Sequence, residues 1–186
     1  MNQKDAAFYG ENGGITISGG EPFMQGNAVI ALLQTCKEKG LHTAVETCGY
    51  ASIDVLRDAH SFVELFLWDL KDTDDERHFH YTGVRTEKIL QNLAEIAQTN
   101  AKIRLRCILV NGVNTNETHY GKIADIAHTI RNFDGVEFIP YHAYSGAKST
   151  FLGGKDNGRC EWIPPREEVD TAKEFLKSRG VLVRNT

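Results

Sequence analysis

Short apolar runs alternate along this chain with runs that have helical periodicity, and this alternation constrains the fold more than any other feature. The strand-like runs lie at residues 15–18, 41–46, 62–70, 102–110, 136–141 and 181–183. Amphipathic stripes between them predict helices over 27–39 and from residues 52, 86, 116 and 164 onward. Such a pattern is typical of parallel strands joined by helical crossovers, so we predict an α/β fold with a parallel sheet.

The number of repeating units limits how far the sheet can close. About five βα units follow one another, whereas a closed eight-stranded barrel takes about 250 residues and this chain has 186. The pattern alone leaves an incomplete barrel or a doubly wound sheet. No repeat or low-complexity segment interrupts it, so we expect a single domain over residues 1–186.

Composition excludes several classes of function. The net charge is −4 and no stretch gathers Lys and Arg into a patch, which argues against a nucleic-acid partner. No apolar run approaches the roughly 20 residues that span a bilayer, and the first residues lack the apolar core of a signal peptide. We therefore expect no membrane association and a cytoplasmic protein.

The cysteines and most of the histidines are expected to have no role at a site. No two of the four cysteines are spaced as Cys-x-x-Cys, and most of them are expected to be small buried residues. Five histidines fall on predicted helices or loops, where we expect them to be solvated. They are His60, His78, His80, His119 and His128.

Polar residues follow the predicted strands at the ends where parallel α/β folds bind ligands. The residues at these ends are Gly19, Gly20, Glu21, Glu46, Thr47, Asp69, Lys71 and His142, and Arg106 lies within the strand at 102–110. Together they supply carboxylates, cations and a Gly-rich turn. This mixture suits a zwitterionic ligand that carries a cationic group and a carboxylate.

Other interpretations of the same residues remain open at this point. The Gly pair can simply make a tight turn, Asp69 and Lys71 can be a surface pair, and Arg106 can lie on the solvated face of an edge strand. Lys71 can also be a Schiff-base lysine of a lyase, with Asp69 or Glu21 as the acid and base. A third alternative is a non-catalytic module that binds a small molecule or a partner protein.

Five segments in this order narrow the choice. They are Gly-Ile-Thr-Ile-Ser-Gly-Gly-Glu-Pro at 14–22, Glu-Thr-Cys-Gly-Tyr at 46–50, Trp-Asp-Leu-Lys at 68–71, Tyr-Thr-Gly at 81–83 and Pro-Tyr-His at 140–142. The combination resembles the radical S-adenosylmethionine (SAM) enzymes that activate glycyl radical enzymes, the family of the pyruvate formate-lyase activating enzyme. The likeness runs from about residue 8 to the C-terminus.

The resemblance implies a partial radical SAM barrel that lacks the first βα unit. It also implies two cofactors, SAM and a 4Fe–4S cluster held by a Cys-x-x-x-Cys-x-x-Cys motif. One electron cleaves SAM, and the resulting radical removes hydrogen from a glycine of the partner enzyme. The implied partners are a glycyl radical enzyme such as pyruvate formate-lyase and an electron donor such as flavodoxin or ferredoxin.

The resemblance also assigns roles to the residues at the strand ends. The turn at 19–21 would receive the SAM amino group, with Glu21 as acceptor, and Lys71 would pair with the SAM carboxylate. Arg106 and His142 would lie by the ribose and the adenine.

A second group of polar residues has a different role in this comparison. Glu46, Thr47 and Asp69 would form a polar cluster near SAM, a possible site for a monovalent cation.

The chain departs from the family at the cluster. None of its four cysteines has the required spacing, and residues 1–10 have the pattern of the end of a helix. We therefore expect that this chain by itself does not ligate the cluster and is inactive as an activase. A fragment that binds SAM or a partner without chemistry is the alternative.

Overall fold

The computed structural model describes residues 13–142 and 159–184. Six strands follow one another in the sheet in the order β1-β2-β3-β4-β5-β6. The pairs β1–β2, β2–β3 and β5–β6 are parallel, with Gly14 opposite His42 and Ala44 opposite Leu65. The predicted parallel α/β fold is confirmed, while the helix end predicted at 1–10 lies outside the described residues.

The elements lie close to their predicted positions. The strands are β1 (Gly14–Ile17), β2 (His42–Thr47), β3 (Leu65–Leu70), β4 (Lys102–Leu109), β5 (Phe133–Pro140) and β6 (Val183–Arg184). The α-helices are α2 (Asn27–Glu38), α3 (Ile53–Ala59), α4 (Asp75–Thr82), α5 (Glu87–Ile96), α6 (Glu117–Thr129) and α8 (Arg166–Ser178). The described ranges also contain three short 3₁₀ helices, η1 (Pro22–Gln25), η2 (His60–Phe62) and η3 (Cys160–Trp162). Helix α4 was not predicted, and β3 lies within the run at 62–70 that was expected to contain a strand.

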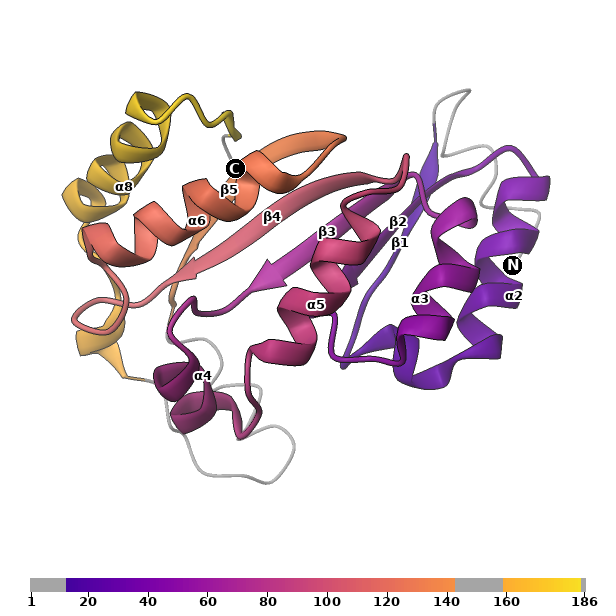
Figure 1. Cartoon of the computed structure of the whole chain (residues 1–186), viewed down its shortest axis with the longest axis horizontal. Coiled ribbons are helices and arrows are strands. Elements are labelled where there is room, and N and C mark those ends of the chain that lie inside the picture. The colour runs from indigo at the N-terminus through magenta and orange to yellow at the C-terminus, as the bar shows by residue number, and fades with distance from the viewer. Residues whose placement is uncertain (1–12, 143–158, 185–186) are drawn as a thin grey trace. The chain divides into compact units, whose positions relative to one another are not determined.

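The chain divides into two compact units, which we describe separately. Unit 1 takes in the chain up to Asp69, Arg85–Arg104 and Thr129–Asp134. In this unit α2, α3 and α5 lie side by side next to β1, β2 and most of β3 (Figure 1). Its core includes the fully buried side chains of Leu33, Val45 and Phe66.

Unit 2 takes in Leu70–Val84, Leu105–His128 and the chain from Gly135 onward. It contains α4, α6 and α8, most of β4 and β5, and β6. Helix α8 packs beside α6 (Figure 1), where the rings of Tyr120 and Phe175 lie 5.8 Å apart. Phe138 and Leu176 are fully buried in its core.

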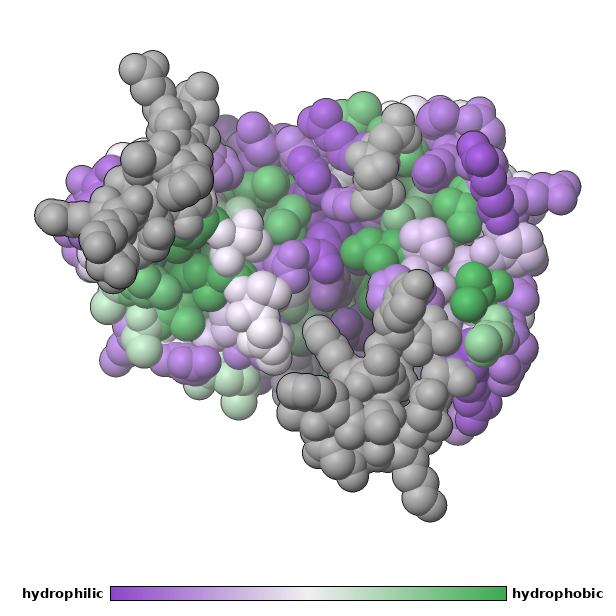
Figure 2. Space-filling view, turned by 180° about the vertical axis from the view of Figure 1, so that it is seen from behind, coloured by the Kyte–Doolittle hydropathy of each residue, from purple (hydrophilic) through white to green (hydrophobic). Residues whose placement is uncertain are grey.

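The strands show two different faces, as the alternation in the sequence predicts. In β4, Leu105, Cys107 and Leu109 are fully buried, whereas Arg106 and Ile108 between them are only half-buried. Figure 2 shows the molecule from behind, where hydrophilic side chains reach the surface between patches of apolar ones. Within the described ranges, no helix combines the length and apolarity needed to cross a membrane.

Candidate functional site

The Glu21 carboxylate lies at the centre of a hydrogen-bond network in unit 1. Gly19 and Gly20, with φ of 93° and 54°, turn the chain after β1. The two Glu21 oxygens accept from Thr47 Oγ1 at 2.8 and 2.9 Å, and one of them accepts from the Cys48 backbone N–H at 2.9 Å. The other accepts from the Phe23 backbone N–H at 3.2 Å, which caps η1. Glu21 therefore ties the turn after β1 to the end of β2.

The turn at the end of β2 is held from both sides. Thr47 Oγ1 accepts from the Gly49 backbone N–H at 2.9 Å. Asn92, buried on α5, donates to the Gly49 and Ala51 carbonyl oxygens at 2.8 and 3.1 Å. Gly49 has a φ of +74°, and a Cβ there would lie 2.1 Å from Trp68 Cζ2. Only glycine fits this position without a shift of the Trp68 ring or of the backbone.

Glu46 points to the same edge of unit 1. The Ser18 hydroxyl donates to Glu46 Oε2 at 2.6 Å, which links the ends of β1 and β2 a second time. Asp69 is half-buried near the end of β3. Among the residues that the structure describes, no three His, Cys, Asp or Glu side chains are grouped to hold a metal ion. The cation site predicted at Glu46, Thr47 and Asp69 stays a prediction.

Lys71 lines a cavity of about 360 Å³ that lies within unit 2. Three aromatic rings form part of the wall, those of Tyr81, Tyr141 and Trp162, and apolar side chains from β4 and the following turn form another part. Tyr81 and Tyr141 each place a ring edge-on to Trp162 at 5.6 Å. The cavity thus joins an apolar, aromatic surface to a charged part of the wall, formed by Lys71, Arg77 and Asp72.

The segment at 159–162 is fixed against the end of β4. Asn111 donates through its backbone N–H to the Trp162 carbonyl at 2.9 Å and through Nδ2 to the Glu161 carbonyl at 3.0 Å. The Arg159 guanidinium lies 4.5 Å from the Trp162 ring centroid, a cation–π geometry. Sequence reasoning missed Trp162 and Asn111, because no pattern near either residue indicates the contact.

Arg106 and His142 also lie in unit 2. Arg106 is half-buried within β4, and His142 is exposed directly after Tyr141, a cavity residue. Unit 2 thus brings Lys71 and the neighbour of His142 to one cavity. The remaining predicted residues belong to unit 1.

Two histidines correct the expectation of solvation. His78 and His119 are 4% and 1% exposed. His78 Nδ1 lies 2.8 Å from the Val84 carbonyl oxygen, and His119 Nδ1 lies 2.7 Å from Thr73 Oγ1. Both expectations were wrong because each ring finds a polar partner that permits burial.

Burial lowers the pKa of His119 to about 4. The Asp72 carboxylate opposes this shift, while the charges of Arg77 and Lys122 add to it. Burial alone would raise the pKa of Asp72. Hydrogen bonds from Arg77 and the Asp74 backbone, together with the nearby charges, nevertheless hold that pKa below its usual range.

The four cysteines do not form a group. Cys36 and Cys107 are buried, as predicted, and burial raises the pKa of the Cys36 thiol. Cys48 is half-buried with its thiol 3.1 Å from Glu21 Oε2, and Cys160 is exposed.

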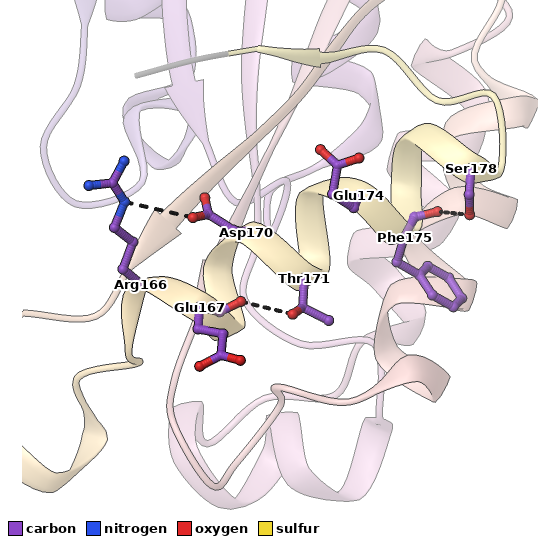
Figure 3. A pocket seen from close by; sticks show the side chains of 7 residues that line it. All are labelled: Arg166, Glu167, Asp170, Thr171, Glu174, Phe175 and Ser178. Carbon is purple, nitrogen blue, oxygen red and sulfur yellow. Dashed lines mark hydrogen bonds and ion pairs between the residues drawn. The ribbon is translucent and has the colours of Figure 1, made fainter.

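A larger hollow of about 720 Å³ runs along α8 and contains none of the predicted residues. All of its lining side chains come from this one helix, and several bond within it (Figure 3). Thr171 donates to the Glu167 carbonyl at 2.8 Å, and Arg166 lies 3.7 Å from Asp170. We assign no function to this exposed helix face.

The family profile of the Radical SAM superfamily matches residues 2–120. The chain belongs to the radical SAM superfamily. The choline trimethylamine-lyase activating enzyme of Oleidesulfovibrio alaskensis is 39% identical over 81% of this chain and 50% of its own length. The isethionate sulfite-lyase activating enzyme of Nitratidesulfovibrio vulgaris is 38% identical over 99% of this chain and 58% of its own length. This radical SAM chain therefore spans about half the length of the curated relatives it matches.

Solved structures agree with this assignment. A domain of a pyruvate-formate lyase-activating enzyme from Bacteroides vulgatus superposes with a TM-score of 0.76 and is 26% identical, over 92% of this chain and 97% of that domain. The resemblance to activating enzymes that the sequence motifs indicate is confirmed, and so is the radical SAM type of fold. The residues that match the radical SAM family profile, 2–120, include β1 to β4 and the ends of these strands.

Proposed function

We propose that this chain is the SAM-binding part of an activating enzyme that generates a glycyl radical on a partner enzyme. The observation that carries the proposal is the cavity beside Lys71, found in a radical SAM chain whose relatives are activating enzymes. The partner would be pyruvate formate-lyase or a related lyase, and flavodoxin or ferredoxin would supply the electron. Activation is proposed for the whole protein, and SAM binding for this chain.

The described residues fit SAM in three ways. Apart from each glycine and its chain neighbours, no atom of the described residues lies within 4 Å of the positions where Cβ atoms of Gly19 and Gly20 would be, so a ligand can approach that backbone closely. The Lys71 ammonium offers a charge-assisted partner for a carboxylate. The apolar and aromatic wall around it suits an adenine ring, since such rings pack favourably against other aromatic faces.

Each proposed contact uses a different part of the chain. Lys71 would bind the carboxylate, and Arg106 and His142 would contact the ribose and adenine. The 19–21 turn would receive the amino group, with Glu21 fixing its geometry. When bound, SAM supplies the radical chemistry, while these residues orient it and exclude water.

The same residues do not fit a 4Fe–4S cluster. The cysteines lack the Cys-x-x-x-Cys-x-x-Cys spacing, and the described part of the chain has no group of three ligands for a metal. We therefore derive no step through a cluster held by this chain.

Titration calorimetry with SAM tests the proposal directly. We expect the wild-type chain to bind SAM, and Lys71→Ala to weaken binding roughly 10- to 100-fold, because a charge-assisted hydrogen bond contributes about 1.5–3 kcal/mol. Lys177→Ala is the matched control, since Lys177 is an exposed lysine of α8 that pairs with Glu174 at 2.7 Å. Absence of SAM binding by the wild-type chain, or equal effects of the two substitutions, would contradict the proposal.

A further inference from the structure

A buried polar network surrounds the short turn that carries Lys71 in unit 2. We call it the turn anchor and define it as Asp72, Thr73, Arg77, Asn114 and His119. Asp72 and Thr73 directly follow Lys71, and the other three side chains reach the turn from α4, α6 and the segment after β4. Apart from the half-buried Arg77, every member is buried.

Asp72 and Arg77 form the first part of the anchor. Arg77 Nε and Nη2 donate to the two oxygens of Asp72 at 2.6 and 2.7 Å, a bidentate pair. The Asp74 backbone N–H donates to the same carboxylate at 2.9 Å. A bidentate guanidinium–carboxylate pair fixes orientation as well as distance, so it holds the turn against the first turn of α4.

Thr73 and His119 form the second part. Thr73 Oγ1 lies 2.7 Å from His119 Nδ1, and Lys122 Nζ donates to the Thr73 carbonyl at 3.3 Å. Both of these partners lie on α6, so the turn is held by a second helix.

Asn114 completes the anchor and contacts Lys71 itself. Its Nδ2 donates to the Lys71 carbonyl at 3.3 Å and to the Ile108 carbonyl at 2.9 Å, and its Oδ1 accepts from the Val110 backbone N–H at 2.7 Å. Asn114 is 1% exposed. It therefore joins the main chain at Lys71 to the end of β4 by hydrogen bonds that need no part of the Lys71 side chain.

We infer that the turn anchor positions Lys71 for the carboxylate of SAM, and that Arg77 and Asn114 are positioning residues of this site. A lysine has a flexible four-carbon stem, so the place of its ammonium depends on a fixed backbone. Asp72, Arg77 and Asn114 line the same cavity as Lys71, which puts the anchor at the ligand rather than in a remote core. This inference rests on the proposed SAM-binding function.

The test compares two ligands that differ at the carboxylate. SAM carries the amino acid moiety that Lys71 would bind, and 5′-methylthioadenosine keeps the adenosine but lacks that moiety. We expect Arg77→Gln to weaken SAM binding about tenfold and to change methylthioadenosine binding less than about twofold. In a Lys71→Ala background, Arg77→Gln should weaken SAM binding no further, because it acts through Lys71.

Two further variants keep the test decisive. Arg77→Gln leaves the Asp72 carboxylate without its main partner, so Asp72→Asn with Arg77→Gln removes both charges and is used if the single variant does not fold. Arg179→Gln is the matched control, since Arg179 makes an exposed ion pair with Asp125 at 3.4 Å in the same unit.

Each outcome separates the inference from the proposed function. A loss confined to SAM that vanishes in the Lys71→Ala background supports positioning. Equal losses for both ligands, or effects that simply add to that of Lys71→Ala, would show a purely structural network and overturn the inference while leaving SAM binding intact. A wild-type chain that binds neither ligand would overturn the proposed function and, with it, this inference.

Discussion

Protonation of His119 should destabilise the chain between pH 6.5 and pH 4. Burial lowers the pKa of this ring to about 4 in the folded chain, whereas an unfolded histidine has a pKa of about 6.5. In this window the unfolded state binds the proton and the folded state does not. The contribution of the neutral ring to stability is therefore complete above about pH 6.5 and is lost as the pH falls toward 4.

The magnitude follows from the two pKa values. Between pH 7.5 and pH 5.0 protonation of His119 should lower the free energy of unfolding by about 2 kcal/mol, and the whole difference between the two pKa values corresponds to about 3 kcal/mol. The charged groups that face the ring are Asp72, Arg77 and Lys122. Asp72 has a pKa below its usual range and stays ionised throughout this interval, so the change belongs to His119.

Urea denaturation at pH 7.5 and pH 5.0 measures this loss. His119→Asn keeps a side-chain amide near Thr73 but cannot titrate, and we expect its free energy of unfolding to fall by about 2 kcal/mol less than that of the wild type over this interval. His128→Asn is the control, because His128 is exposed on the same helix, α6, and should behave as the wild type does. Equal losses in His119→Asn and the wild type would refute the reasoning.

Three further substitutions test the geometry of unit 1, and Gly83→Ala in unit 2 serves as a control for one of them. In urea denaturation, Gly49→Ala should lower the free energy of unfolding by about 2–4 kcal/mol, because the new Cβ meets Trp68 and φ is positive. Gly83 has a φ of +79° but open space around it, so Gly83→Ala should lower the free energy of unfolding only by the cost of the backbone conformation, about 1–2 kcal/mol. Asn92→Ala leaves two turn carbonyls without their donor and should lower the free energy of unfolding by about 1–3 kcal/mol. Scanning calorimetry measures this loss, and an unchanged stability would contradict these hydrogen bonds. Glu21→Gln replaces an all-acceptor carboxylate with an amide that brings a donor to the same N–H groups, and thermal melts should show a loss of about 1–3 kcal/mol.

Local periodicity explains why most of the fold could be predicted. Strand and helix patterns depend on residues two to four positions apart, so Leu105, Cys107 and Leu109 indicate one face of β4 without any tertiary information. Helix α4 escaped prediction because it buries little apolar surface. The signals that were present are its ends, where Asp74 caps the Arg77 N–H at 2.9 Å and Gly83 adopts the left-handed conformation.

The site could be predicted only as far as topology dictates it. Parallel strands bring their carboxyl ends to one edge, which is why Glu21 and Thr47 meet although they are 26 residues apart. No comparable rule joins Thr73 to His119, which are 46 residues apart, or Asn111 to the carbonyl oxygen of Glu161. Such partners come from the sides of the sheet, and only the packing of α6 and the 159–162 segment reveals them.

The position of a side chain proved easier to predict than its partner. Glu21 lies where the strand-end rule puts it, yet its oxygens already accept hydrogen bonds from Thr47, Cys48 and Phe23. Because these hydrogen bonds fix the turn, Glu21 sets the shape of the backbone that would meet a ligand. We expect the amino group of SAM to contact the backbone of residues 19–20 rather than the Glu21 carboxylate. Lys71 is held through its main chain, because Asn114 donates to its main-chain oxygen at 3.3 Å. We propose that the Lys71 ammonium binds the carboxylate of SAM, and Lys71→Ala is therefore the substitution that tests the proposed preference for a carboxylate ligand.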